Sequence, residues 1–296
     1  MSLGTAYPAH EALVAPGRSK QQLWRLLLGL GMIAAVSYAL NLMLFLTLLR
    51  FTSLDWLIAL EQGSTPLALL ILLASFGFLT LGVGLAAGLL QHRSLLSLIG
   101  SPGLMLQQFL RCSLAGLAIF AVLFILPPYD FGAPLIANLS WPVWLGLLPL
   151  SLLALLVQVS AEELIFRGYL QQGLAARFQN PLIWLGLPAA LFGAAHYMPQ
   201  VAGDNALLIC FWAMGFGLLM ADLTARAGTL GPAIAVHFVN NFVALLIFGS
   251  PSSLHGLALY LLPYEMSDVA EMRPWLMVDC ATMLVLWLAA RLVIRR

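Results

Sequence analysis

Long apolar stretches separated by short polar turns run through almost the whole chain. Charges, prolines and glycines bound eight of them, at about residues 24–49, 65–90, 105–127, 142–166, 182–198, 205–225, 231–249 and 275–294. Stretches of this kind are long enough for a helix to cross the hydrocarbon core of a bilayer, which is roughly 30 Å thick. The pattern predicts an all-α, polytopic membrane protein with about eight transmembrane helices in one bundle.

Composition agrees with this prediction and excludes other classes. Hydrophobic residues make up 62% of the chain and charged residues 8%, which is outside the range of soluble domains. The net charge is +1 and no basic patch alternates with aromatic residues, so we expect membrane lipid as a partner and no nucleic acid. Cys112, Cys210 and Cys280 lie in apolar runs without CxxC spacing, which favours buried packing thiols over a disulfide or metal cluster.

The basic residues predict the orientation. An even number of spans puts both termini on one side, and with a cytoplasmic N-terminus all 13 lysines and arginines except Arg50 and Arg273 fall inside. We therefore expect a multi-pass protein of a bacterial cell (inner) membrane with cytoplasmic termini. Its predicted parts are a cytoplasmic tail (1–22), three spans without a recognised motif (23–141), a core with polar motifs (142–249), and an outer loop with the last span (250–296).

Two adjacent carboxylates and an arginine interrupt the fourth apolar run. A charge at the bilayer centre costs roughly 2.5–3.5 kcal/mol on insertion scales, so such residues indicate a functional site. Glu163 and Arg167 are spaced i,i+4 and can pair on one helix face. Glu162, rotated by about 100°, remains free for another partner and suits a general base. A salt-bridge network in which both glutamates join helices is the structural alternative.

A predicted hairpin brings Glu162 close to a histidine. The polar turn Gln179-Asn180-Pro181 should reverse the chain. Glu162 lies 18 residues before Asn180 and His196 lies 16 residues after it, so at about 1.5 Å per residue the two reach nearly the same height. A carboxylate and an imidazole facing each other can polarise a water between them. Alone, His196 would more simply be a hydrogen-bonded structural group.

A third polar cluster lies in the seventh span. His237 and Asn241 are spaced i,i+4 and project from one helix face. Imidazole N–H and carboxamide N–H groups can stabilise the oxyanion of a tetrahedral intermediate. Asn240, one step round the helix, is expected to face elsewhere.

Three motifs in order carry a family resemblance. The patterns EExxxR (Glu162, Glu163, Arg167), FxxxH (Phe192, His196) and HxxxN (His237, Asn241) resemble the CAAX prenyl protease and bacteriocin-processing (CPBP or ABI) family, which includes the type II CAAX endopeptidases. The resemblance covers about residues 142–249. It implies an intramembrane glutamate-type endopeptidase that uses no catalytic metal or other cofactor.

The resemblance also implies roles for the motif residues. Glu162 and His196 would activate water, and His237 and Asn241 would stabilise the oxyanion. Glu163 and Arg167 would support them. The implied substrate is a membrane-associated or lipidated protein or peptide, whereas the sequence leaves the cleaved bond and the oligomeric state open.

Three alternatives remain at this stage. Glu162, His196 and His237 could bind Zn²⁺ with an open position for water, although no HExxH motif is present. Glutamate and histidine inside a bundle also suit a transporter or proton relay, but no internal repeat supports one. A noncatalytic immunity or scaffolding protein that binds a peptide or membrane partner is the main alternative.

Two other polar features receive structural interpretations. Asp222 and Arg226 are spaced i,i+4 at the inner end of the sixth span and should form a structural ion pair. His10 lies in the predicted tail and is expected to be solvated.

Overall fold

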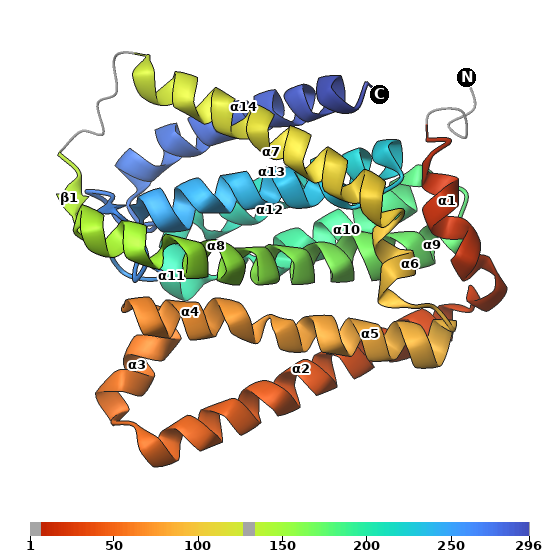
Figure 1. Ribbon diagram of the computed structural model, residues 1–296, viewed down its shortest axis with the longest axis horizontal. Coiled ribbons are helices and arrows are strands. Elements are labelled where there is room, and N and C mark those ends of the chain that lie inside the picture. Colours follow the sequence, from red (N-terminus) through yellow and green to blue (C-terminus); the bar gives the residue numbers. More distant parts are fainter. Residues whose placement is uncertain (1–6, 127–133, 296) are drawn as a thin grey trace.

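Nearly parallel and antiparallel helices form one bundle, and both chain ends lie at the same end of it (Figure 1). The computed structural model describes residues 7–126 and 134–295. Residues 1–6 of the predicted tail, residue 127 of the third predicted span and Arg296 lie outside the described residues.

The first part of the chain contributes an N-terminal segment (residues 7–20) and the helices before the motif region. The segment consists of α1 (His10–Val14) and a 3₁₀ helix (Ala15–Lys20). The helices are α2 (Leu23–Phe51), α3 (Leu54–Gln62), α4 (Pro66–Ser75), α5 (Gly77–Gln91), α6 (Leu95–Ile99) and α7 (Pro102–Ile125). α2 packs along α5 and diverges from α4 toward the end of the bundle away from the termini (Figure 1).

The motif region begins at α8 (Trp141–Glu163), which continues into a π-helix (Leu164–Gln171) and α9 (Gln172–Arg177). It goes on through α10 (Pro181–Ala195), α11 (Pro199–Ala202), a 3₁₀ turn (Gly203–Asn205) and α12 (Ala206–Ala227). α13 (Gly231–Phe242) is followed by a second π-helix (Val243–Ile247), and α14 (Val269–Ile294) ends the chain. Strands β1 (Ile136–Ala137), β2 (Phe248–Gly249) and β3 (Tyr260–Leu261) form a small sheet in the order β1-β3-β2.

Eight apolar helical stretches correspond to the eight predicted spans. Within the described residues, six are long and apolar enough to cross a membrane: Leu23–Phe51, Pro66–Gln91, Pro102–Ile125, Trp141–Arg177, Pro199–Ala227 and Val269–Ile294. Two shorter apolar helices, Pro181–Ala195 and Gly231–Ile247, complete the set. The all-α class is confirmed, since each strand has two residues, and the chain is a multi-pass membrane protein.

Local signals fix the ends of α10. Asn180 caps the helix, because its side-chain oxygen accepts a hydrogen bond from the Leu182 amide at 3.0 Å. The predicted span 182–198 extends too far, since the helix ends at Ala195 and Pro199 follows shortly after. His196 is therefore the first residue beyond the helix rather than part of it.

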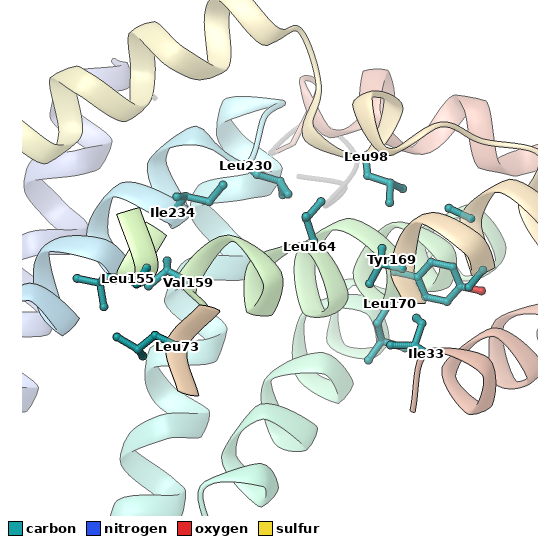
Figure 2. Close-up of a cluster of buried hydrophobic side chains, with 14 of the residues drawn as sticks. Ile33, Leu73, Leu98, Leu155, Val159, Leu164, Tyr169, Leu170, Leu230 and Ile234 are labelled. Atoms are coloured by element: carbon teal, nitrogen blue, oxygen red, sulfur yellow. The ribbon is translucent and has the colours of Figure 1, made fainter. Parts of the chain in front are cut away.

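The buried core surrounds α8. Figure 2 shows Leu155 and Val159 of α8 together with leucines and isoleucines from α2, α4, α6, the π-helix and α13. Small residues bring α10 and α12 close together: a Cβ on Gly193 would lie 2.6 Å from the Cys210 carbonyl oxygen, and one on Gly217 would lie 3.1 Å from the Ala189 Cα. This close approach positions the motif helices against one another.

The cysteine and His10 predictions need correction. Cys112, Cys210 and Cys280 are free thiols, but only Cys112 is fully buried. His10 is only 4% exposed, because the N-terminal segment packs against the bundle and the His10 ring lies 4.7 Å from the Trp184 ring centroid. The sequence predicts solvation because it does not show that Trp184 of α10 covers this ring.

Candidate active site

The two glutamates end α8, where the helix widens into a π-helix. Glu163 and Arg167 have side-chain exposures of 0% and 1%, and Arg167 Nη1 donates to Glu163 Oε1 at 2.9 Å. Arg167 Nη2 also donates to the Gly217 carbonyl at 3.1 Å. The predicted pair therefore forms, deeply buried, and it joins α8 to α12. π-helical turns frequently occur at functional sites.

His237 of α13 lies between the two glutamates. Its Nδ1 donates to Glu163 Oε1 at 2.8 Å, since a carboxylate oxygen can only accept. Its Nε2 lies 3.7 Å from Glu162 Oε2, which is too long for a direct hydrogen bond. Glu163 thus fixes the orientation of the imidazole as well as pairing with Arg167, and Nε2 points toward Glu162.

His196 is oriented by its own helix. Its Nδ1 lies 2.8 Å from the Phe192 carbonyl oxygen, which can only accept, so Nδ1 carries the proton. In the neutral ring Nε2 is then an acceptor. The Phe192 ring packs near both histidines, with its centroid 4.6 Å from that of His196 and 6.0 Å from that of His237.

Two further amides complete the polar cluster: Gln158, which the sequence analysis did not single out, and Asn240. Gln158, one turn before Glu162, donates from Nε2 to Glu162 Oε1 and accepts from Asn241 Nδ2 at 3.2 Å. Asn240 was expected to face elsewhere, but its Nδ2 donates to Asn241 Oδ1 at 3.3 Å. The i,i+4 spacing of Gln158 and Glu162 was the available signal.

These side chains surround a cavity of about 60 Å³. Glu162 Oε2 and Trp212 Nε1 are shielded from solvent and have no hydrogen-bond partner in the described part of the chain. The volume is sufficient for water but not for a peptide. The lining residues are Gln158, Glu162, Phe192, His196, Trp212, Phe216, His237, Asn240 and Asn241.

The predicted residues occupy this site in two ways. Glu162, His196, His237 and Asn241 all line the cavity. Glu163 and Arg167 are not among the lining residues: Glu163 binds His237, and Arg167 binds Glu163. In residues 7–126 and 134–295, no group of three or more His, Cys, Asp or Glu side chains has an arrangement that could hold a metal ion.

The fold is that of a multi-pass helical membrane protein. Its site is a cavity inside the bundle that carboxylate, imidazole and amide side chains line. Residues 142–243 match the family described as type II CAAX prenyl endopeptidase, Rce1-like. This segment contains all the motif residues, so the predicted family resemblance is confirmed for it.

The chain also resembles a curated bacterial protein. It is 29% identical over 119 residues to the uncharacterized protein YyaK of Bacillus subtilis (strain 168), over 40% of this chain. The matched region spans 39% of the length of that relative. No solved structure matches the chain.

Proposed function

We propose that this protein is an intramembrane endopeptidase that hydrolyses a peptide bond of a membrane-associated or lipidated protein or peptide. The observation that carries the proposal is that Glu162, His196, His237 and Asn241 line one cavity, within the segment that matches the CAAX endopeptidase family. The proposed setting is a bacterial inner membrane with both termini in the cytoplasm. The first three spans have no assigned role in the reaction.

The proposed chemistry begins with a water in the cavity. Glu162 and His196 Nε2 hold this water, and one of them takes a proton as its oxygen attacks the scissile carbonyl carbon. The tetrahedral oxyanion accepts hydrogen bonds from His237 Nε2–H and Asn241 Nδ2–H. When the C–N bond breaks, the stored proton passes to the leaving amine. The products are a carboxylic acid and an amine, and no metal takes part.

The surrounding charges support a donor role for His237. Its Nδ1–H is bound to Glu163, so Nε2 can donate only when the ring carries both protons. Glu162 and Glu163 together outnumber Arg167 by one charge. The net negative charge of this buried cluster favours a hydrogen-bond donor at His237 Nε2 over an acceptor.

The small cavity has a consequence for substrate entry. About 60 Å³ holds water but no peptide segment, so we propose that the site widens when a substrate binds. We propose entry from the cytoplasmic leaflet, because the chain continues from α8 through the π-helix into α9, and α9 lies at the end of the bundle that carries the termini (Figure 1).

A comparison of released peptides tests the proposal. Cells carrying wild type, Glu162→Gln or His196→Ala are compared by mass spectrometry of membrane and soluble peptides, at matched protein levels. Products present only with wild type are expected, and they would also identify the substrate. Identical profiles would contradict catalysis and favour a noncatalytic binding protein.

The metal-free form of the reaction needs its own experiment. The identified substrate is incubated with purified protein after exhaustive chelation, with metal content measured in parallel. Full cleavage by metal-free protein is expected. Loss of cleavage that added Zn²⁺ restores would instead support a zinc enzyme.

A further inference from the structure

Three amides and one carboxylate form a chain of hydrogen bonds with a single direction. Asn240 Nδ2 donates to Asn241 Oδ1, Asn241 Nδ2 donates to Gln158 Oε1, and Gln158 Nε2 donates to Glu162 Oε1. Ionised Glu162 can only accept, so it fixes which end of the Gln158 amide faces it. The opposite end of Gln158 then has to accept, and this fixes Asn241 in turn.

We propose that Gln158 is a positioning residue that orients Glu162 and Asn241 for the reaction. This inference rests on the proposed function. Gln158 is 6% exposed, lies on α8 one turn before Glu162, and reaches Asn241 on α13. It therefore links Glu162, which is proposed to activate water, to Asn241, which is proposed to stabilise the oxyanion. Gln158 belongs to none of the three sequence motifs.

The orientation of Asn241 matters because the nitrogen end of its carboxamide would stabilise an oxyanion, whereas the oxygen end would repel it. With Nδ2 held toward Gln158 and Oδ1 toward Asn240, the remaining N–H of Asn241 is available to the cavity. A flipped carboxamide would present its oxygen there and repel an oxyanion. The Gln158 carbonyl prevents the flip, because it cannot donate to Asn241 Oδ1.

The orientation of Glu162 matters for the same reason. Gln158 binds Oε1, so Oε2 is left without a hydrogen-bond partner and lies 3.7 Å from His237 Nε2. The free oxygen can therefore accept the proton of a water in the cavity. Without the Gln158 donor, the carboxylate would lose one of its stabilising contacts and could rotate.

A second buried glutamine provides a matched control. Gln172 is fully buried and also bridges two elements, since its Oε1 accepts from Arg93 Nη2 and its Nε2 donates to the Leu98 carbonyl, both at 2.8 Å. It does not line the cavity. Gln172→Met thus measures the effect of losing a bridging amide on stability alone.

Three substitutions at Gln158 separate its contacts. Gln158→Met keeps the length of the side chain and removes both hydrogen bonds. Gln158→Glu can still accept from Asn241 but cannot donate to Glu162 when ionised, and it adds a like charge beside it. Gln158→Asn retains the chemistry on a shorter side chain.

The first readout is cleavage by full-length protein in membranes, using the peptide product defined by wild type and Glu162→Gln. We expect Gln158→Met to lower kcat about 10- to 100-fold with little change in KM, below the 10²- to 10³-fold cost of removing an oxyanion donor. Gln158→Asn should recover part of the rate. Gln172→Met should lower thermal stability and leave the rate per folded molecule unchanged.

The second readout needs no substrate. Dicyclohexylcarbodiimide modifies protonated carboxyl groups in apolar surroundings, and the extent of Glu162 labelling is measured by mass spectrometry at one fixed pH. The groups around Glu162 are Gln158, His196, His237 and the Glu163–Arg167 pair. Losing the donor favours the protonated acid, and a like charge favours it further. Labelling at one fixed pH should therefore be greater in Gln158→Met than in wild type, and greater still in Gln158→Glu.

The two readouts distinguish failure of this inference from failure of the proposed function. Unchanged labelling in both Gln158 variants would overturn the inference, whatever the cleavage assay gives. A normal kcat in Gln158→Met would overturn its role in the reaction. If Glu162→Gln also releases the product, the proposed function is wrong, while a labelling shift would still support the contact between Gln158 and Glu162.

Discussion

Two carboxylate–arginine pairs with the same i,i+4 spacing occupy different surroundings in this bundle. Asp222 accepts from Arg226 Nε at 2.8 and 2.9 Å, from the Tyr7 hydroxyl at 2.8 Å and from the Trp287 indole at 3.0 Å, so both oxygens have partners. Glu163 Oε1 accepts from Arg167 and His237, whereas Oε2 has no partner in the described residues.

The difference shows that the same i,i+4 carboxylate–arginine pattern can form a structural ion pair at Asp222 and support a candidate active site at Glu163. The Asp222 cluster uses its full acceptor capacity to join the N-terminal segment, α12 and α14. The Glu162–Glu163 cluster keeps unused acceptor oxygens beside a cavity. Unused capacity at a buried carboxylate is costly, and it is also what a water-activating site requires.

Substitutions in the two clusters should differ most in their effect on peptide cleavage. Glu162→Gln keeps the shape of the side chain and removes the base, so product release should fall about 10²- to 10⁴-fold. Asp222→Asn should release product at the wild-type rate per folded molecule. Quantitative mass spectrometry of the product checks both. Equal losses in the two variants would mean that Glu162 has no special role.

The second difference concerns stability. Arg167→Met leaves Glu163 buried without its guanidinium partner, which should lower the free energy of unfolding by about 3–5 kcal/mol. Arg226 is 21% exposed at its side chain, so Arg226→Met should cost only about 1 kcal/mol. Equilibrium unfolding in detergent micelles measures both values. A larger loss for Arg226→Met would reverse the comparison.

The N-terminal segment, which supplies Tyr7 to the Asp222 cluster, should make stability depend on pH. Burial lowers the pKa of His10 from 6.5 to about 4, because the neutral ring packs against Trp184 and faces the amide nitrogen of Gln171 at 3.4 Å. The unfolded chain therefore binds the proton more readily. The contribution of His10 to the free energy of unfolding is fully present above pH 6.5. It falls by about 3 kcal/mol as the pH drops to 4.

Substitution of His10 tests this pH dependence. His10→Phe keeps an aromatic ring beside Trp184 and removes the titration, so its unfolding free energy should vary less between pH 6.5 and 4 than that of wild type. Unfolding curves in the same detergent at several pH values measure the difference. Parallel pH profiles for the two proteins would rule out His10 as the cause.

The smallest expected effect comes from the hydroxyl of Tyr7. Tyr7→Phe removes one of several hydrogen bonds to Asp222, which should lower the free energy of unfolding by about 1 kcal/mol. Cleavage activity should stay at the wild-type level. A specific loss of activity in Tyr7→Phe would mean that the two clusters are coupled.

Strong local signals made much of the fold and site predictable. The cap and proline at Asn180-Pro181 set the hairpin, and i,i+4 spacing predicted both carboxylate–arginine pairs. Glu162 and His196 were predicted to face each other because hairpin geometry depends mainly on residue counts. These features depend on neighbouring residues or on helix rise, both of which can be read from the sequence.

The missed features depend on contacts between distant parts of the chain. A single glutamine such as Gln158 resembles any polar residue in a span, until Asn241 is known to face it. Asn240 was predicted to face away from the site, but adjacent residues of α13, Asn240 and Asn241, both line the cavity. The π-helix after Glu163 was not expected, since hydrophobic periodicity does not resolve one extra residue in a turn.

The docking of the N-terminal segment sets an order of events during biosynthesis. Tyr7 and Asp222 are 215 residues apart, and Trp287 of the same cluster comes later still. The ribosome therefore releases Tyr7 long before its partners exist, and the emerging segment has to wait while the other helices insert. The Tyr7–Asp222 contact closes a long loop and can form only after α12 has been made. A protein stalled before α14 would lack the Trp287 contact to the same carboxylate.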